Sequence, residues 1–114
     1  MISVGIDIVS VKRFSFLIEK YGDKFLQRVF SKVEYDYCSR RKDRHICYAG
    51  KFAAKEAVIK AMGLKNISLR NIEILNSEGT PFVRVNGEIV RGSSISVSHE
   101  RDFAIAVCAF VKEV

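Results

Sequence analysis

The sequence predicts a single α+β domain over residues 1–114, with one antiparallel-rich sheet and helices inserted after the first strand. Three observations lead to this fold class. Residues 2–9 alternate as a β-strand does, residues 10–63 follow helical patterns, and strand-like alternation returns after residue 64. With 48% hydrophobic and 28% charged residues, the composition is typical of a globular protein.

The first strand, residues 2–9, carries an acid among aliphatic residues. Alternation places four side chains on one face, which we expect to form the core: Ile2, Val4, Ile6 and Ile8. Asp7 falls on the opposite face, where it is either an exposed edge-strand charge or a metal ligand. Gly5, two residues earlier on that face, leaves room for a backbone or a ligand to approach.

Three helical segments should follow before residue 40. Ser10 can cap a helix that ends at Gly22, with Phe14, Leu17, Ile18 and Tyr21 inward. Asp23 can cap a short second helix. The sequence S-x-x-E at residues 31–34 predicts a capping box and a third helix.

A longer helix should begin near Asp43 or Arg44 and end at Gly63. Its stripe of alanines indicates tight packing on a sheet, because small residues let another backbone come close. Glu56 and Lys60 lie one turn apart on another face. Lys51 and Lys55 form a second such pair, so this face is either solvated or part of a binding site.

The last half of the chain predicts strands separated by turns. We expect strands at residues 72–75, 82–85, 94–98 and 103–111, with a turn at residues 76–81. The last strand is apolar on both faces, which predicts a central strand covered on both sides.

Charge favours polyanionic partners, since the net charge is +6 and the isoelectric point is near 9.4. The basic run at residues 40–45 is either a solvated helix end or an anion clamp. The sequence contains no signal peptide and no apolar run of membrane-spanning length, so we expect a cytoplasmic protein. The three cysteines, Cys38, Cys47 and Cys108, are expected to be buried thiols.

Few residues could carry chemistry. Asp7 and Glu56 are carboxylates able to hold Mg²⁺, and Lys60 could neutralise a phosphate. A Mg²⁺-dependent nuclease is disfavoured because its second acid and lysine usually share a strand, whereas these lie on a helix. A nucleic-acid-binding module would leave both acids without a role, and the tyrosines beside the basic run lie on predicted helices rather than on a sheet.

Three segments of the chain, taken in order, resemble one enzyme family. They are G-I-D-I-V-x-x-x-R at residues 5–13, F-A-A-K-E-A-x-x-K-A-x-G at residues 52–63, and S-x-S-H-E at residues 96–100. The pattern is similar to that of holo-acyl-carrier-protein synthases in the 4′-phosphopantetheinyl transferase superfamily. The resemblance covers nearly the whole chain and implies the fold of that superfamily.

The resemblance implies transfer of 4′-phosphopantetheine from coenzyme A to a serine of an acidic apo-acyl carrier protein, with release of adenosine 3′,5′-bisphosphate, in support of fatty acid biosynthesis. It implies Asp7 and Glu56 as catalytic Mg²⁺ ligands and Lys60 as a catalytic phosphate contact. Lys55 would contact a phosphate or aid deprotonation, and Arg13 would dock the carrier protein.

Further residues would bind coenzyme A: Lys42, Arg44, Lys51, Ser98 and His99. The resemblance also implies a homotrimer with sites between subunits, and it implies neither nucleic acid nor membrane as a partner. It leaves open whether a metal-bound water or one of the acids accepts the serine proton.

Two positions depart from the family pattern. Ser10 stands where the family usually has an acid, and Lys51 stands where it usually has an arginine. Lysine keeps the charge but loses the bidentate geometry of a guanidinium, so the phosphate contact at position 51 is expected to be weaker or different.

Overall fold

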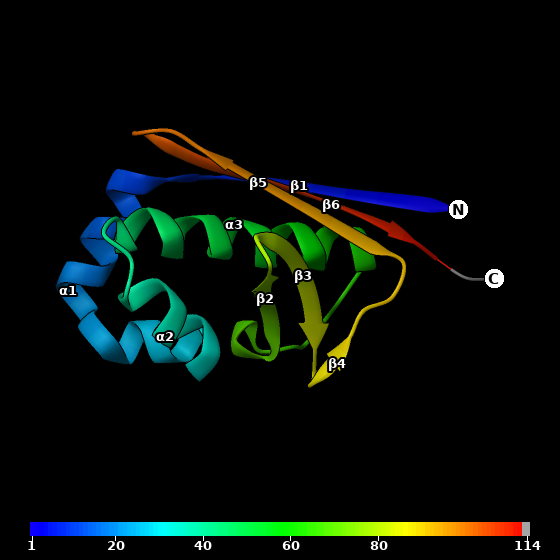
Figure 1. Cartoon of the computed structure of the whole chain (residues 1–114), viewed down its shortest axis with the longest axis horizontal. Coiled ribbons are helices and arrows are strands. Elements are labelled where there is room, and N and C mark those ends of the chain that lie inside the picture. Colours follow the sequence, from blue (N-terminus) through cyan, green and yellow to red (C-terminus); the bar gives the residue numbers. More distant parts are fainter. Residues whose placement is uncertain (113–114) are drawn as a thin grey trace.

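The computed structural model describes residues 1–112. In chain order its helices and strands, drawn in Figure 1, are β1 (Ile2–Ser10), α1 (Val11–Val29), α2 (Lys32–Ser39), α3 (Arg44–Met62), a 3₁₀ turn (Leu69–Asn71), β2 (Ile72–Ser77), β3 (Thr80–Val85), β4 (Glu88–Ile89), β5 (Ser93–His99) and β6 (Phe103–Val111). The α+β class and the insertion of the helices after the first strand are confirmed.

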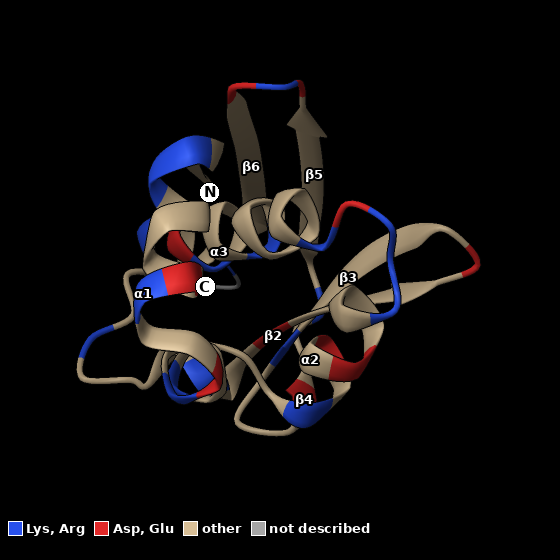
Figure 2. Cartoon of the chain, turned by 90° about the vertical axis from the view of Figure 1, so that its left-hand side faces the viewer, with Lys and Arg blue, Asp and Glu red and all other residues tan. Residues whose placement is uncertain are grey.

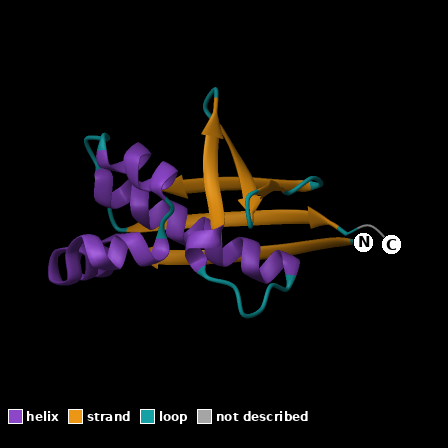
Figure 3. Cartoon of the chain, turned by 90° about the horizontal axis from the view of Figure 1, so that it is seen from below, coloured by secondary structure: helices purple, strands orange, loops and turns teal. Residues whose placement is uncertain are grey.

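The strands form two antiparallel sheets where the sequence predicted one. The larger sheet has the order β1-β6-β5 and the smaller has the order β2-β3-β4. Strand β6 is central in its sheet, as predicted. Seen from below in Figure 3, the strands of the smaller sheet run at a steep angle to those of the larger one, so the two sheets do not continue each other.

Helix α3 lies in the middle of the molecule. Figure 1 shows the larger sheet on one side of it and α1, α2 and the smaller sheet on the other. Its alanines at positions 53, 54, 57 and 61 are buried, and Gly63 ends it with a left-handed φ of 65°. Covered from both sides, α3 buries polar positions as well as its alanine stripe.

The face of β1 that forms the core is the opposite of the predicted one. Gly5 is buried, and a Cβ built on it would lie 2.1 Å from the carbonyl oxygen of Ala57 on α3. This backbone-to-backbone approach draws the Gly5 and Asp7 face onto the helix. The aliphatic side chains expected in the core are exposed instead: Ile2, Val4, Ile6 and Ile8.

Strand β6 is likewise covered on one face only within a single chain. Ala104, Ala106 and Cys108 pack toward α3 and are buried. The alternate side chains of Phe103, Ile105 and Val107 are exposed, which corrects the prediction of cover on both sides. In register, Ile6 pairs with Val107 and Ile8 with Ile105, so the exposed aliphatic residues of both strands share a surface. We call this surface the outer sheet face.

The helical region before α3 follows its capping signals at Ser10 and Ser31, whereas Asp23 Oδ1 accepts a hydrogen bond from the Tyr35 hydroxyl. The Ser10 side chain accepts a hydrogen bond from the N–H of Arg13, and Gly22 breaks the regular geometry of α1 with a φ of 64°. Ser31 and Glu34 form the predicted capping box. One inward assignment was wrong, because Tyr21 is exposed.

The loop between α2 and α3 is closed by a disulfide between Cys38 and Cys47, which corrects the expectation of buried free thiols. Spacing alone gave no sign of it, because the two residues meet only when α2 and α3 fold back on each other. Cys108 is a buried free thiol, as expected. In the part of the chain that the structure describes, no helix has the length and apolar character required to cross a membrane.

Candidate functional site

Asp7, Glu56 and Lys60 form a polar group where β1 crosses α3. The Lys60 Nζ donates to the carbonyl oxygen of Ile6 at 2.8 Å and lies 3.4 Å from Asp7 Oδ1. The side chain of Lys60 is 53% exposed and that of Asp7 is 19% exposed, so the group is open to solvent on one side. The close approach at Gly5, two residues along the strand, holds Asp7 against the helix.

The Asp7 carboxylate influences the titration of Glu56. Burial raises the pKa of Glu56, the negative charge of Asp7 raises it further, and Lys60 lowers it. Among the described residues the Glu56 side chain has no hydrogen-bond partner, whereas the Asp7 side chain accepts a hydrogen bond from Lys60. An acid that is costly to ionise and lacks a partner is one that a cation would stabilise.

The donor set fits Mg²⁺. That cation typically takes one or two carboxylates and completes its shell with waters and substrate phosphates. Within residues 1–112 no group of three or more histidine, cysteine, aspartate or glutamate side chains comes together as a metal site. A pair of acids beside a lysine therefore suits a cation shared with a phosphorylated substrate better than a cation enclosed by protein ligands.

A separate cavity of about 680 Å³ lies on the β5 side of α3. Its basic lining comes from the α2–α3 loop, from α3 and from the end of β5, and consists of Arg40, Arg41, Lys42, Lys51 and His99. Figure 2 shows the basic α2–α3 loop. Neither acid of the first group lines this cavity, so a single chain holds two distinct polar sites.

The structure divides the residues expected to bind coenzyme A. Lys42, Lys51 and His99 line the cavity, whereas Arg44 and Ser98 do not. Ser98 pairs with Ile105 and is exposed, which places it on the outer sheet face. Arg44 is exposed in the first turn of α3, next to the α2–α3 loop.

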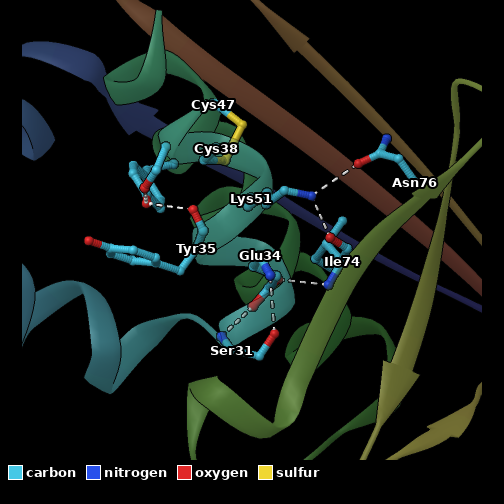
Figure 4. Close-up of a disulfide and its surroundings, with 10 residues drawn as sticks. Ser31, Glu34, Tyr35, Cys38, Cys47, Lys51, Ile74 and Asn76 are labelled. Atoms are coloured by element: carbon cyan, nitrogen blue, oxygen red, sulfur yellow. Dashed lines mark hydrogen bonds between the residues drawn. A yellow bond between two sulfur atoms is a disulfide. The ribbon is translucent and has the colours of Figure 1, made fainter. Parts of the chain in front are cut away.

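Lys51 is buried at the wall of the cavity. Its Nζ donates to the carbonyl oxygen of Ile74 and to Asn76 Oδ1, as Figure 4 shows, and it lies 4.7 Å from the centre of the Tyr37 ring. Burial lowers its pKa to about 8, with a smaller upward effect from Glu34.

Lys55 is enclosed in protein. Its Nζ donates to Glu34 Oε1 at 2.6 Å and to the carbonyl oxygens of Leu69 and Ile72, and both charged side chains are 0% exposed. Burial lowers its pKa, and Glu34 opposes that effect. All three N–H donors therefore have protein acceptors, which leaves none directed at the Asp7 and Glu56 group.

Sequence reasoning missed Tyr37, Asn76 and the partner role of Glu34. Tyr37 was considered only as one of the tyrosines beside the basic run, and Asn76 only as the start of a turn, whereas the structure places both on the cavity wall. Glu34 was expected only to cap α2, but its second oxygen also accepts the N–H of Ile74. Arg13, on the exposed first turn of α1, does not line the cavity.

Comparison with known proteins identifies the family of this chain. The model of the family described as "4′-phosphopantetheinyl transferase superfamily" matches residues 3–108. The chain belongs to this superfamily. The resemblance inferred from three short motifs is thereby confirmed, and so is the enzyme class.

Similar transferases are holo-[acyl-carrier-protein] synthases from several bacteria. The one from Halothermothrix orenii is 40% identical over 90% of this chain and 91% of that protein. The one from Thermodesulfovibrio yellowstonii is 43% identical over 90% of this chain and 92% of that protein.

Solved structures of such synthases share the fold. The Neisseria meningitidis synthase superposes with a TM-score of 0.86 at 31% identity, covering 98% of this chain and all (100%) of that one. The Helicobacter pylori synthase, solved in complex with coenzyme A, gives a TM-score of 0.79 at 33% identity over 92% of this chain and 96% of that one.

Proposed function

We propose that this transferase moves 4′-phosphopantetheine from coenzyme A to a serine of apo-acyl carrier protein, in a Mg²⁺-dependent reaction that releases adenosine 3′,5′-bisphosphate. The observation that carries the proposal is the group of Asp7, Glu56 and Lys60 in a chain of this superfamily. Coenzyme A complexes of related synthases support the choice of donor.

In this reaction the serine hydroxyl gives up its proton to a base, and its oxygen attacks the phosphorus that carries the pantetheine arm. The bond from that phosphorus to the bridging oxygen breaks, and adenosine 3′,5′-bisphosphate leaves with that oxygen. Because negative charge develops on the phosphates, catalysis requires fixed cations and accurate positioning. Lys60, open to solvent and held by Ile6 and Asp7, is placed to supply one such charge.

Asp7 and Glu56 would hold Mg²⁺, which neutralises pyrophosphate charge when bound. Their own contribution is a fixed pair of oxygens on two rigid elements, β1 and α3. The raised pKa of Glu56 indicates that its charge is poorly compensated by the protein alone, and so a cation should bind there favourably.

The cavity would take the nucleotide end of coenzyme A. Arg40, Arg41 and Lys42 come from one loop and His99 from the end of β5, so basic side chains approach from two sides. Phosphate groups suit such a lining, because Arg and Lys provide charge-assisted hydrogen bonds. Lys51, whose Nζ lies 4.7 Å from the centre of the Tyr37 ring, would contribute positive charge from the cavity wall.

A homotrimer would combine the two sites. The outer sheet face exposes Ile2, Val4, Ile6, Ile8, Phe103, Ile105 and Val107, an apolar surface that typically marks an interface. Covering it with a second copy would also bring Ser98 to a subunit boundary, since that residue lies on the same face. Coenzyme A would then bind between the acids of one subunit and the cavity of a neighbour.

An acidic carrier protein would dock on α1. Arg13 and Lys12 are exposed in its first turn, and the net charge of +6 favours an acidic partner. The product would serve fatty acid biosynthesis, which needs holo-carrier protein. We expect this to occur in the cytoplasm, without nucleic acid or membrane as a partner.

The test is the intact mass of an acidic apo-acyl carrier protein after incubation with this protein, coenzyme A and Mg²⁺. The expected result is a gain of one phosphopantetheine that disappears with EDTA and returns with excess Mg²⁺. No gain with several carrier proteins would contradict the proposed substrate, and a gain unaffected by EDTA would contradict the metal site.

A further inference from the structure

The disulfide in Figure 4 closes the loop that carries most of the cavity's charge. Cys38 lies in the last turn of α2 and Cys47 near the start of α3, nine positions apart in sequence, with Cα atoms 5.5 Å apart. Residues 40–43 lie between them, and Arg40, Arg41 and Lys42 line the cavity. The covalent bond therefore joins the two ends of the proposed phosphate-binding loop.

Little else holds this loop in place. Within residues 1–112, no side chain from residues 40–45 forms a hydrogen bond or an ion pair with another residue. The N–H of Arg41 donates to the carbonyl of Cys38 at 3.1 Å, and its guanidinium lies 4.7 Å from the centre of the Tyr37 ring. Asp43 precedes α3 without a side-chain cap. If the disulfide opened, only these weak contacts would remain to order the three basic side chains of the loop.

The two sulfurs differ in access. Cys38 is fully buried, whereas Cys47 is partly exposed and lines the cavity. A small thiol can therefore reach Cys47 from the cavity but cannot reach Cys38. The arginines and lysines that line the cavity favour the thiolate form of a thiol that enters it.

We propose that Cys38 and Cys47 form a reversible thiol–disulfide site whose oxidised state holds the basic loop ready for the phosphates of the nucleotide. The inference rests on the proposed function, because it takes adenosine 3′,5′-bisphosphate as the group that the cavity binds. In the reduced state the loop must be ordered at the moment of binding, and the affinity falls by that cost.

The exchange partner is a low-molecular-weight thiol, written RSH. Its thiolate attacks Cys47 Sγ, the bond between the two protein sulfurs breaks, and Cys38 leaves as a thiolate that takes up a proton. A second RSH then attacks the mixed disulfide, which releases Cys47 as a thiol and forms RSSR. Two RSH are oxidised and one protein disulfide is reduced. The reverse sequence, starting from RSSR, closes the loop again.

Linkage adds a second consequence. If the oxidised form binds the nucleotide more tightly by some factor, saturating nucleotide must shift the thiol–disulfide equilibrium toward the oxidised form by the same factor. A purely structural disulfide that did not influence the loop would show neither effect.

The experiment equilibrates the full chain with mixtures of reduced and oxidised glutathione. The fraction of paired Cys38 and Cys47 is measured by alkylation and peptide mass, and the affinity for adenosine 3′,5′-bisphosphate by titration calorimetry. We expect the oxidised form to bind about fivefold more tightly or better, the scale of ordering a few charged side chains. Saturating nucleotide should move the glutathione midpoint by the same factor.

Three variants sharpen the test. Cys47→Ser, changed at the partly exposed member, should bind like the reduced chain under both conditions. Cys108→Ala, which alters the buried cysteine outside the pair, should keep the full redox response. Lys65→Ser, a charge change outside the cavity lining, should also keep it.

The outcomes separate this inference from the proposed function. Equal affinity of both forms, or a midpoint that nucleotide does not move, would overturn the redox site while the proposed function stands. A pair that stays reduced at every glutathione ratio would do the same. Failure of both forms to bind adenosine 3′,5′-bisphosphate would overturn the proposed nucleotide site and this inference together.

Discussion

Position 51 shows how one residue responds to its surroundings. Lys51 replaces the arginine that the family pattern favours, and in the structure it is buried against Ile74 and Tyr37. A guanidinium keeps its charge at any physiological pH, whereas a buried ammonium can lose its proton. The substitution should therefore make nucleotide binding sensitive to pH.

Burial lowers the pKa of Lys51 from its usual 10.5 to about 8, so nucleotide affinity should fall as the pH rises above about 8. In Lys51→Arg the alkaline fall should move to a higher pH. Calorimetric titration with adenosine 3′,5′-bisphosphate between pH 7 and pH 10 measures both curves. Identical curves for the two proteins would show that the charge of Lys51 does not contribute to nucleotide affinity.

The lowered pKa of Lys51 also predicts how the stability of the folded chain changes with pH. Between about pH 8 and 10.5 the unfolded chain binds more protons at Lys51 than the folded chain does, so folding becomes more favourable as the pH rises through this window. Compared with Lys51→Met, the wild-type chain should gain roughly 2–4 kcal/mol in its free energy of unfolding. Urea denaturation at pH 7.5 and pH 10 gives the difference, and no gain would contradict the lowered pKa.

Glu56→Gln should reduce turnover at least about 100-fold, because a neutral amide cannot replace a charged Mg²⁺ ligand. Since burial and Asp7 raise the pKa of Glu56, the ionised acid opposes folding at neutral pH, and the variant should melt no lower than wild type. The carrier-protein mass assay and thermal melting check the two halves. Glu88→Gln, at an exposed acid on β4, is the matched control and should stay active.

At the residue scale the sequence predicted the acids better than the lysines. Asp7, Glu56 and Lys60 come together as the family resemblance implied, whereas the helix pattern alone placed only Glu56 beside Lys60. The burial of Lys51 and Lys55 could not be predicted, because a polar helix face usually faces solvent. Only the docking of α2 and β2 on that face of α3 reveals that both lysines are enclosed.

Among the elements, a buried ion pair connects α2, α3 and β2. Lys55→Met should cost about 3–5 kcal/mol of folding free energy, because Glu34 would be left charged and buried. The double variant Glu34→Gln with Lys55→Met should recover part of that loss, since it leaves no isolated charge. Urea denaturation of the three proteins measures the coupling energy.

Lys32→Met provides the control for this pair, because its ion pair with Asp36 is exposed and should contribute less than about 1 kcal/mol. If Lys55→Met lowered the free energy of unfolding as little as Lys32→Met does, the enclosed ion pair would not stabilise the fold. Full activity of Lys55→Met at a temperature where it stays folded would also exclude a direct phosphate contact.

At the element scale the limits of the sequence are clearest in β1. Alternation correctly separated Gly5 and Asp7 from the aliphatic residues, but hydrophobicity assigned the core to the wrong side. In an isolated chain the glycine face is buried, because only glycine permits the close approach of α3. The disulfide was missed for a related reason, since Cys38 and Cys47 meet through helix packing that no local pattern records.

For the whole molecule, the outer sheet face predicts self-association. Ile6 is 59% exposed in the single chain, and Ile6→Arg should place a charge in the proposed interface. Light scattering after size-exclusion chromatography should find three chains of 12.9 kDa for wild type and a single chain for the variant, with loss of turnover.

Ile89→Arg is the matched control for the assembly, because Ile89 is similarly exposed but lies on β4 of the other sheet. It should remain trimeric and active. A wild-type chain that is monomeric yet fully active would contradict the shared site, whereas a trimer retained by Ile6→Arg would place the interface elsewhere.

Arg13→Glu should raise the KM for the carrier protein about tenfold at low ionic strength, since it replaces attraction to an acidic partner by repulsion. The defect should shrink in 1 M salt, where exposed charges are screened within about 3 Å. Initial rates at several salt concentrations test this. Arg91→Glu makes the same charge change between β4 and β5 and should have little effect, and a salt-independent loss in Arg13→Glu would indicate a folding defect.

The contact at Gly5 has a consequence for how this chain can vary. A methyl group there would lie 2.1 Å from the carbonyl oxygen of Ala57, so the main chains of β1 and α3 meet without an intervening side chain. Substitutions in an ordinary core can be absorbed when neighbouring side chains adjust, but two backbones in contact have no such freedom. The interval between the Asp7 and Glu56 carboxylates therefore depends on a residue outside the proposed metal-binding pair, and an inherited change at position 5 should alter the proposed catalysis by displacing a whole strand.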